Sequence, residues 1–121
     1  MAESHLLGKE GEEQAVGYLR SKGYKILHRN WVSGKRELDI IAENNEFVVF
    51  VEVKTRSHDF HLPQGDLVTK EKQRSMIFAA DSYIRRYNIN KESRFDVITI
   101  ISGGKTIEIE HTESAFYPTL R

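Results

Sequence analysis

Residues 36–57 read RELDIIAENNEFVVFVEVKTRS, and this stretch decides the fold. Two apolar runs, 38–42 and 47–51, flank a polar segment, a pattern that predicts a β-hairpin. The paired Asn44 and Asn45 tolerate the left-handed backbone that tight hairpin turns require. The second run is apolar at consecutive positions, as expected of a strand covered on both faces of its sheet.

Glu52 and Lys54 stand at the end of this apolar strand, where charged side chains need an explanation. Burying a lone charge costs several kcal/mol unless the charge is paired, hydrogen-bonded or bound to a metal. A turn centred on the two asparagines predicts that Asp39 lies opposite Phe50 and Glu37 opposite Glu52. Three carboxylates and one ammonium group are then expected on one face of the sheet: Glu37, Asp39, Glu52 and Lys54.

Carboxylates that lie this close repel one another, and such a cluster suits a hard divalent cation such as Mg²⁺. A neighbouring lysine would position or deprotonate a water molecule, or neutralise developing negative charge. The alternative is a surface ion pair between Glu52 and Lys54 on a half-exposed strand, with Glu37 and Asp39 solvated. The tripeptide pattern E-x-K is common by itself, so spacing alone does not separate the two interpretations.

A family resemblance favours the first interpretation. The arrangement of Asp39, Glu52 and Lys54 resembles the D-(x)n-E-x-K pattern of the PD-(D/E)xK nuclease superfamily. More narrowly, the chain resembles the YraN-type family of bacterial endonuclease-like proteins, which is similar to archaeal Holliday-junction resolvases. The matching segments cover nearly the whole chain in order: GKEGEEQA, GYKILHRNW, ELDIIA, VFVEVKTRS, KQR, RFDVI and EHTESAF.

The resemblance implies a metal-dependent endonuclease that hydrolyses phosphodiester bonds of DNA, including branched or recombination intermediates. It implies that Asp39, Glu52 and Glu12 hold Mg²⁺ or Mn²⁺ and that Lys54 activates the attacking water, so that these four residues are catalytic. It also implies nucleic-acid contacts by Arg36, Arg56, Lys72 and Gln73. Two positions depart from the family pattern: Leu38 stands where the superfamily has its nominal proline, and Arg36 stands where many members have glycine.

The resemblance and the pattern of apolar residues both predict an α/β fold of order αβββαββ, with a restriction-endonuclease-like mixed sheet flanked by helices in a single domain, 1–121. The segments expected are a helix over 4–22 capped by Ser4 and stopped at Gly23, a strand over 24–32, the hairpin, a loop over 55–68, a helix over 69–87 capped by Thr69, and strands over 94–101 and 106–111. The crossover helix makes the third and fourth strands parallel. In the first helix, Glu12 borders the buried face and Glu13 faces water.

Composition sets limits on these interpretations. The 121 residues carry a formal net charge of +0, which gives no overall attraction to nucleic acid, and contain no cysteine for a disulfide or a thiol nucleophile. No apolar run approaches the ~20 residues that span a membrane, so we expect a cytoplasmic protein. One basic stretch has no acidic residue within it and forms either a phosphate-facing patch or an ordinary solvated surface: Arg20, Lys22, Lys25, Arg29, Lys35 and Arg36.

Several expectations favour structural roles or leave the function open. His58 and His61 are interpreted as ordinary loop residues, Trp31 and Asp96 as structural, and the tail as packing Phe116 and Tyr117. The alternative functions are a non-catalytic nucleic-acid-binding or assembly module and, third, a structural protein whose acidic cluster only binds a cation. A homodimer would suit symmetric cleavage of two strands. No sequence feature names a protein partner.

Overall fold

A computed structural model describes residues 2–58 and 67–118, with side chains from residue 9 onward. Its elements are α1 (Ala2–Ser21), β1 (Lys25–Ser33), β2 (Arg36–Glu43), β3 (Phe47–Ser57), α2 (Lys70–Tyr87), β4 (Glu92–Ser102) and β5 (Glu108–Phe116). The predicted order αβββαββ is confirmed. The central part of the predicted loop, 59–66, which includes His61, lies outside the described residues.

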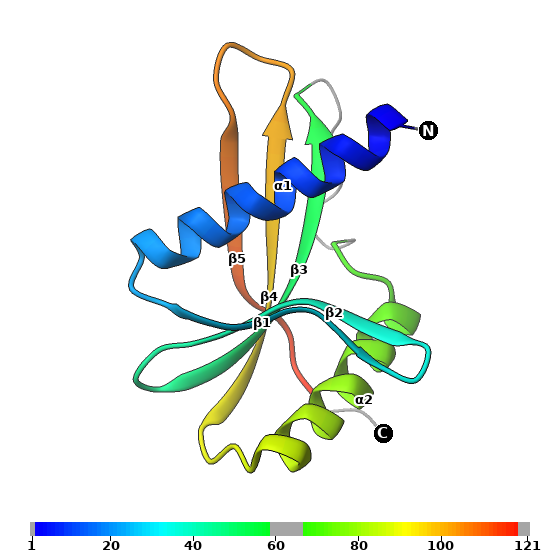
Figure 1. Ribbon diagram of the computed structural model, residues 1–121, viewed down its shortest axis with the longest axis vertical. Helices are drawn as coiled ribbons and strands as arrows, with labels where there is room; N and C mark the ends of the chain where they lie inside the picture. The colour runs from blue at the N-terminus through cyan, green and yellow to red at the C-terminus, as the bar shows by residue number, and fades with distance from the viewer. Residues whose placement is uncertain (1, 59–66, 119–121) are drawn as a thin grey trace.

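The strands form one mixed sheet in the order β1-β2-β3-β4-β5. The pairs β1–β2, β2–β3 and β4–β5 are antiparallel, and β3 and β4 are parallel, as the crossover through α2 predicts. Figure 1 shows β3, β4 and β5 extending toward the top of the view, while the β1–β2 hairpin projects to the right. Strands β2 and β3 therefore diverge beyond their paired segment.

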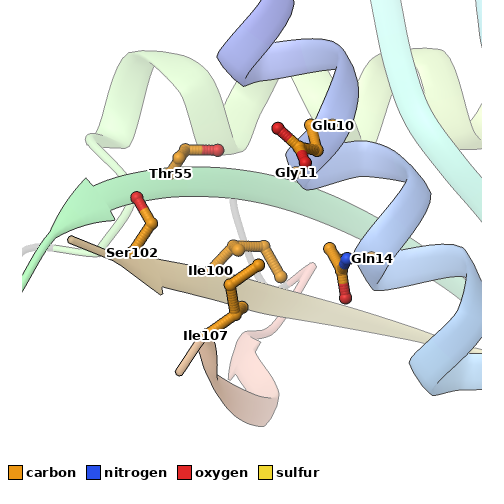
Figure 2. Close-up of a pocket in the computed structure, with 7 residues that line it drawn as sticks. All are labelled: Glu10, Gly11, Gln14, Thr55, Ile100, Ser102 and Ile107. Atoms are coloured by element: carbon orange, nitrogen blue, oxygen red, sulfur yellow. The ribbon is translucent and has the colours of Figure 1, made fainter. Parts of the chain in front are cut away.

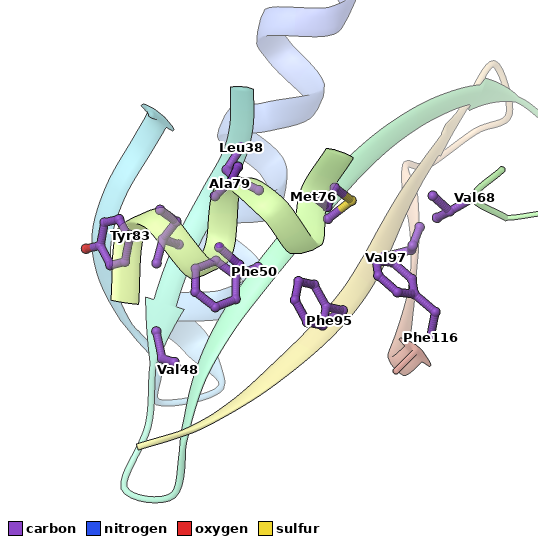
Figure 3. Close-up of a cluster of buried hydrophobic side chains, with 12 residues drawn as sticks. Leu38, Val48, Phe50, Val68, Met76, Ala79, Tyr83, Phe95, Val97 and Phe116 are labelled. Carbon is purple, nitrogen blue, oxygen red and sulfur yellow. The ribbon is translucent and has the colours of Figure 1, made fainter. Parts of the chain in front are cut away.

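Each face of the sheet carries one helix and one hydrophobic core. On one face, α1 packs Ala15, Val16 and Leu19 against a cluster that includes Val49 and Val51. On the other face, α2 packs Met76 and Tyr83 against the sheet residues Leu38, Phe50 and Phe95 (Figure 3). This explains why the strand that begins at Phe47 is apolar at consecutive positions, since both of its faces are covered.

The helix ends follow the local sequence signals with one exception. Thr69 caps α2 and accepts a hydrogen bond from the Lys72 backbone N–H, as predicted. Gly23, just past α1, has a φ of 93°, a conformation that glycine adopts without strain. Helix α1 begins at Ala2, so Ser4 lies inside it, and the predicted cap at Ser4 is wrong.

The predicted hairpin is present, but its register is wrong by two residues. Phe50 pairs with Ile41 rather than with Asp39. Asn44 causes the shift, because its side-chain oxygen accepts hydrogen bonds from the backbone N–H groups of Glu46 and Phe47 and so starts the turn one residue later. Neither asparagine of the pair has a positive φ, so the expected left-handed turn is also wrong.

The end of the chain differs from the prediction in two ways. Strand β5 starts later and continues to Phe116, well beyond the predicted end at His111. Phe116 is buried as expected, whereas Tyr117 is 64% exposed, because the strand ends before it and its side chain has no core to enter. In the part of the chain that the structure describes, no helix is long and apolar enough to cross a bilayer.

Other structural expectations hold. Trp31 is half-buried and packs edge-on against Tyr83, with 5.1 Å between ring centroids. His58 lies just after β3, where its backbone N–H donates to the Ser102 carbonyl at 2.7 Å. Asp96 is fully buried in β4, where it is bound by neighbouring side chains.

Candidate active site

The candidate site lies where β2 separates from β3. The pairing of these strands ends at Ile40 and Val51. If it continued, Leu38 would pair with Val53, but the Val53 N–H instead donates to the Asp39 carboxylate, with 2.9 Å between N and Oδ2. The Asp39 side chain therefore takes the place of the next backbone hydrogen bond between the two strands. We call the point beyond it, where β2 and β3 diverge, the fork.

The chain also changes face at this point. Leu38 is buried in the core under α2, whereas Ile40 is buried in the core under α1, although side chains two residues apart in a regular strand share a face. On β1, Asn30 stands between the residues that pair with Leu38 and Ile40, and it has a φ of 52°. This irregularity places Asp39 at the point where the side chains of β2 change from the core under α2 to the core under α1.

The environment of Asp39 is unfavourable for its charged form. Burial and the negative charge of Glu52 raise the pKa of the Asp39 carboxyl to about 7, with a smaller contribution from Glu12. The Val53 N–H and the charge of Lys72 act in the opposite direction and only partly compensate. Asp39 thus occupies a site that favours added positive charge.

Glu52 lies between two ammonium groups. Lys54, two residues later on β3, places Nζ 3.7 Å from Glu52 Oε2, and Lys72, at the start of α2, places Nζ 3.7 Å from Oε1. The three side chains meet on the α2 side of the sheet because alternate residues of β3 face that side. Lys72 was predicted as a nucleic-acid contact, and its ion pair with Glu52 brings it into the cluster.

Glu12 approaches from α1, on the opposite side. Its side chain is 14% exposed and accepts hydrogen bonds from Arg29 at 3.3 Å and from Asn30 at 3.1 Å. Glu13 is exposed and also binds Arg29, at 2.9 Å, and these two carboxylates raise the pKa of the Arg29 guanidinium. The predicted orientations of both glutamates are confirmed.

A close contact between α1 and β3 fixes the position of this part of the helix. A Cβ on Gly11 would lie 2.4 Å from the Thr55 hydroxyl, so only glycine fits without a shift. Gly11, Thr55 and Ile100 line a small cavity of about 30 Å³. Figure 2 shows these residues, with α1 lying over the strands that carry Thr55 and Ile100. Because Glu12 follows Gly11 directly, this contact also determines how close Glu12 lies to the sheet.

Glu37 does not join the cluster, contrary to the prediction. It is exposed and pairs with Val32 of β1, and it forms no ion pair within the described residues. The reason is the fork: β2 has already left β3 at this point, so Glu37 cannot lie opposite Glu52.

Two predicted nucleic-acid contacts lie on the edge of the site. Arg56 lies on β3 rather than in the predicted loop, because β3 continues to Ser57, and it donates to the Thr55 carbonyl. Gln73 lies in the first turn of α2, and its side-chain N–H donates to the Val68 carbonyl at 3.0 Å. Its amide group therefore stabilises the entry to the helix.

The described residues offer an open donor set for a metal rather than a closed cage. Across the described ranges, no three side chains of His, Cys, Asp or Glu lie close enough to hold a metal ion between them. Asp39 and Glu52 are two neighbouring carboxylates, and Mg²⁺ in proteins is commonly held by one or two carboxylates together with waters and substrate phosphates. The residues present fit such a site, because a divalent cation would offset the burial and repulsion that raise the pKa of Asp39.

Asp96, which is fully buried, was interpreted from the sequence as structural, but its partners were not identified. Asp96 accepts two hydrogen bonds from Arg94, at 2.9 and 2.8 Å, and one from His111 at 2.7 Å. His111 in turn bonds to the Tyr18 hydroxyl at 3.0 Å. The spacing of Arg94 and Asp96 on one strand was a usable signal for their pairing, because side chains two residues apart share a face.

The sequence analysis also missed the role of Arg29 and Asn30 in binding Glu12. Both residues belong to a segment that was considered only for phosphate binding or for its place in β1. The contact depends on the positive φ at Asn30, which lets both side chains reach the α1 side. Asparagine tolerates this conformation better than most residues, but strand periodicity gives no sign of it.

Comparison with known proteins identifies the family. Residues 11–100 match the model of the uncharacterised protein family UPF0102. The chain is 52% identical over 121 residues to a UPF0102 protein of Bacteroides fragilis, with 99% of each chain covered. It is 45% identical over 118 residues to one of Flavobacterium psychrophilum, covering 97% of this chain and 98% of the relative. The protein therefore belongs to the UPF0102 family.

Proposed function

We propose that this protein is a metal-dependent endonuclease of the PD-(D/E)xK type, resembling the YraN-type endonuclease-like proteins, and that it hydrolyses phosphodiester bonds of DNA. One observation carries the proposal. Asp39 is a half-buried carboxyl group at a fork in the sheet, with its pKa raised to about 7, beside Glu52 and two lysines. Strongly perturbed carboxyl groups with a specific charged neighbour are characteristic of functional sites.

Asp39 and Glu52 are the residues that would hold Mg²⁺ or Mn²⁺, with Glu12 reaching the site from α1. A divalent cation in this place supplies Lewis acidity toward the phosphoryl group and lowers the pKa of a water molecule. Glu12 is already bound by Arg29 and Asn30, so it would act at the edge of the site. Its proposed contribution is to add negative charge and to hold water.

Lys54 would orient the attacking water and neutralise charge that develops on the phosphate. Its ammonium group is 3.7 Å from Glu52 and is partly exposed, so it can reach both the carboxylate and an incoming phosphate. Lys72 occupies an equivalent position on the other oxygen of Glu52. The two lysines would thus bind the substrate on either side of the acidic pair.

The remaining proposed contacts extend outward from this centre. Arg36, Arg56 and Gln73 would bind the DNA backbone next to the cleaved bond. The proposal also includes a cytoplasmic location and a homodimer, because two symmetric sites would cleave two strands of a branched DNA.

A non-catalytic module that binds nucleic acid or assembles with a partner is the second candidate. It is favoured by the lack of a three-ligand metal cage within the described residues, whereas the net charge of +0 gives it no overall attraction to nucleic acid. The same acidic pair argues against it, because a pure binder gains nothing by placing Asp39 and Glu52 where phosphate must approach.

The experiment that tests the proposal is cleavage of labelled DNA with Mg²⁺ or Mn²⁺. The substrates are single-stranded, flapped, branched and continuous duplex DNA. Wild type is compared with Asp39→Asn, Glu52→Gln and Lys54→Ala. The matched control is Asp81→Asn, the same chemical change at an exposed carboxylate that pairs with Arg85 on α2.

Mn²⁺ binding, measured by calorimetry, gives a readout that does not depend on activity. We expect cleavage by wild type and by the control, and loss of at least 100-fold in the three site variants, about the effect of removing one catalytic group. Binding of Mn²⁺ should be lost in Asp39→Asn. DNA binding without cleavage or metal binding would instead support the non-catalytic module.

A further inference from the structure

An exposed aromatic ring lies beside the candidate site. Phe78 of α2 is 58% exposed and falls outside the apolar stripe that includes Met76 and Tyr83. The Arg36 guanidinium, at the start of β2, lies over the ring at 4.2 Å from its centroid. This arrangement leaves much of a large apolar surface in water, next to a cation.

Phe78 lies on the same row of α2 side chains as Lys72, which contacts the acidic pair of Asp39 and Glu52. Lys72, Ser75 and Phe78 follow one another at three-residue spacing, on a row that turns about 120° around the helix axis between Lys72 and Phe78. At ~1.5 Å rise per residue, Phe78 lies about 9 Å along the helix from Lys72, whose ammonium contacts Glu52. A ligand about one or two nucleotides long would span this distance.

The charges around the ring suit a phosphate backbone. Arg36 stacks on Phe78, and Arg74 lies one helical turn before it. Neither arginine forms an ion pair with any other part of the chain that the structure describes. Both guanidinium groups are therefore available to a phosphate, whereas Arg29, Lys54 and Lys72 already bind carboxylates.

We propose that Phe78 and Arg36 form a stacking platform for an unpaired base next to the cleaved phosphodiester bond. The substrate class that follows is DNA with an unpaired segment at the site, as in flaps, gaps and branch points, rather than continuous duplex. In a continuous duplex both faces of each base are already covered by its neighbours, so no face is offered to the ring. This inference rests on the proposed nuclease function and assigns its substrate class.

The test measures DNA affinity by fluorescence anisotropy in EDTA, so that cleavage does not interfere. Single-stranded, 5′-flapped and continuous duplex DNA of equal length are compared for wild type, Phe78→Ala and Phe78→Trp. Tyr117→Ala is the matched control, because Tyr117 is an aromatic side chain that is 64% exposed and lies on the chain end after β5.

We expect Phe78→Ala to weaken binding of the single-stranded and flapped DNA about tenfold and to leave duplex affinity within about twofold, because base stacking on an aromatic ring contributes at this level. Phe78→Trp should retain wild-type affinity, and the control should change nothing. Equal affinities of Phe78→Ala and wild type for flapped DNA, with cleavage intact, would overturn this inference alone. If the protein binds none of these DNAs, the proposed function fails and the inference fails with it.

Discussion

Two aspartates of the sheet, Asp96 fully buried and Asp39 half-buried, have opposite electrostatic environments. Asp96 in β4 receives two hydrogen bonds from Arg94, one from His111 and one from the Ser114 backbone N–H. Although burial acts to raise its pKa, these hydrogen bonds hold the pKa of Asp96 below its usual value. The charge of Asp96 is therefore fully compensated by the folded chain.

Among the described residues, the Asp39 side chain in β2 accepts one hydrogen bond, from the Val53 N–H, and it lies near two other carboxylates. Burial and the charge of Glu52 raise its pKa to about 7. The charged form of aspartate is thus stabilised at position 96 and destabilised at position 39 of the same sheet. The contrast separates a structural ion pair from the proposed metal site, since a carboxylate whose charge is uncompensated gains from binding positive charge.

The largest expected effect is at the compensated aspartate. Asp96→Ala should destabilise the fold by ~3–5 kcal/mol, because it leaves the Arg94 charge buried without its partner. Urea unfolding at neutral pH measures the change. Asp81→Ala, which removes an exposed pair with Arg85, should cost less than ~0.5 kcal/mol. A loss below ~1 kcal/mol in Asp96→Ala would mean that the contrast between the two aspartates is not energetic.

The second prediction has the opposite sign. At pH 8 without divalent metal, Asp39→Asn should stabilise the fold by ~1–3 kcal/mol, because it removes a charge that the folded state disfavours. Because the folded pKa of about 7 exceeds the ordinary value of 3.8, Asp39 contributes stability that is fully present below pH 3.8 and is lost as pH rises through about 7. The gain in Asp39→Asn should therefore shrink toward pH 4. A lower unfolding free energy of Asp39→Asn than of wild type at pH 8 would contradict this prediction.

Divalent metal should reverse the disadvantage of the charged Asp39. With Mn²⁺ at about ten times its dissociation constant, the wild type should gain ~1.4 kcal/mol in unfolding free energy at pH 8. Thermal or urea unfolding with and without Mn²⁺ measures this gain. Asp39→Asn should gain nothing, whereas Asp81→Asn should gain as much as the wild type. Equal gains in wild type and Asp39→Asn would place the metal elsewhere.

The last prediction concerns two glycines of α1. Gly11→Ala should destabilise by ~1–3 kcal/mol through overpacking against Thr55, whereas Gly17→Ala should stabilise by ~0.5–1 kcal/mol, because a Cβ on Gly17 meets nothing within 4 Å. Adding Thr55→Ala should recover most of the loss in Gly11→Ala. Unfolding experiments on the single and double variants test both signs. Equal effects of the two substitutions would show that α1 is not tightly seated near the fork.

Much of the fold could be predicted from local pattern. The order of the elements, the parallel pairing of β3 and β4 and the Thr69 cap follow from apolar periodicity and from known helix and crossover rules. The register of the hairpin could not be predicted, because the side chain of Asn44 competes with the backbone for the turn hydrogen bonds.

Most residues of the candidate cluster could be named from the sequence, with Glu37 as the exception, whereas their arrangement could not. The pattern of Asp39, Glu52 and Lys54 was visible in the sequence, but the fork depends on a side chain that replaces a strand pairing. The contacts of Glu12 depend on a positive φ at Asn30, which strand periodicity does not report. Phe78 gave a signal that was not used, since it is a large aromatic residue on the polar side of its helix.

The close contact between Gly11 of α1 and Thr55 of β3 limits how this sequence can change during evolution. A carboxylate at position 12 has a near substitute in aspartate, which differs by one methylene group. The hydrogen atom that Gly11 presents to the Thr55 hydroxyl has no substitute among the other amino acids, since each of them adds at least a Cβ. Drift should therefore be more restricted at this unreactive glycine than at the charged residue beside it.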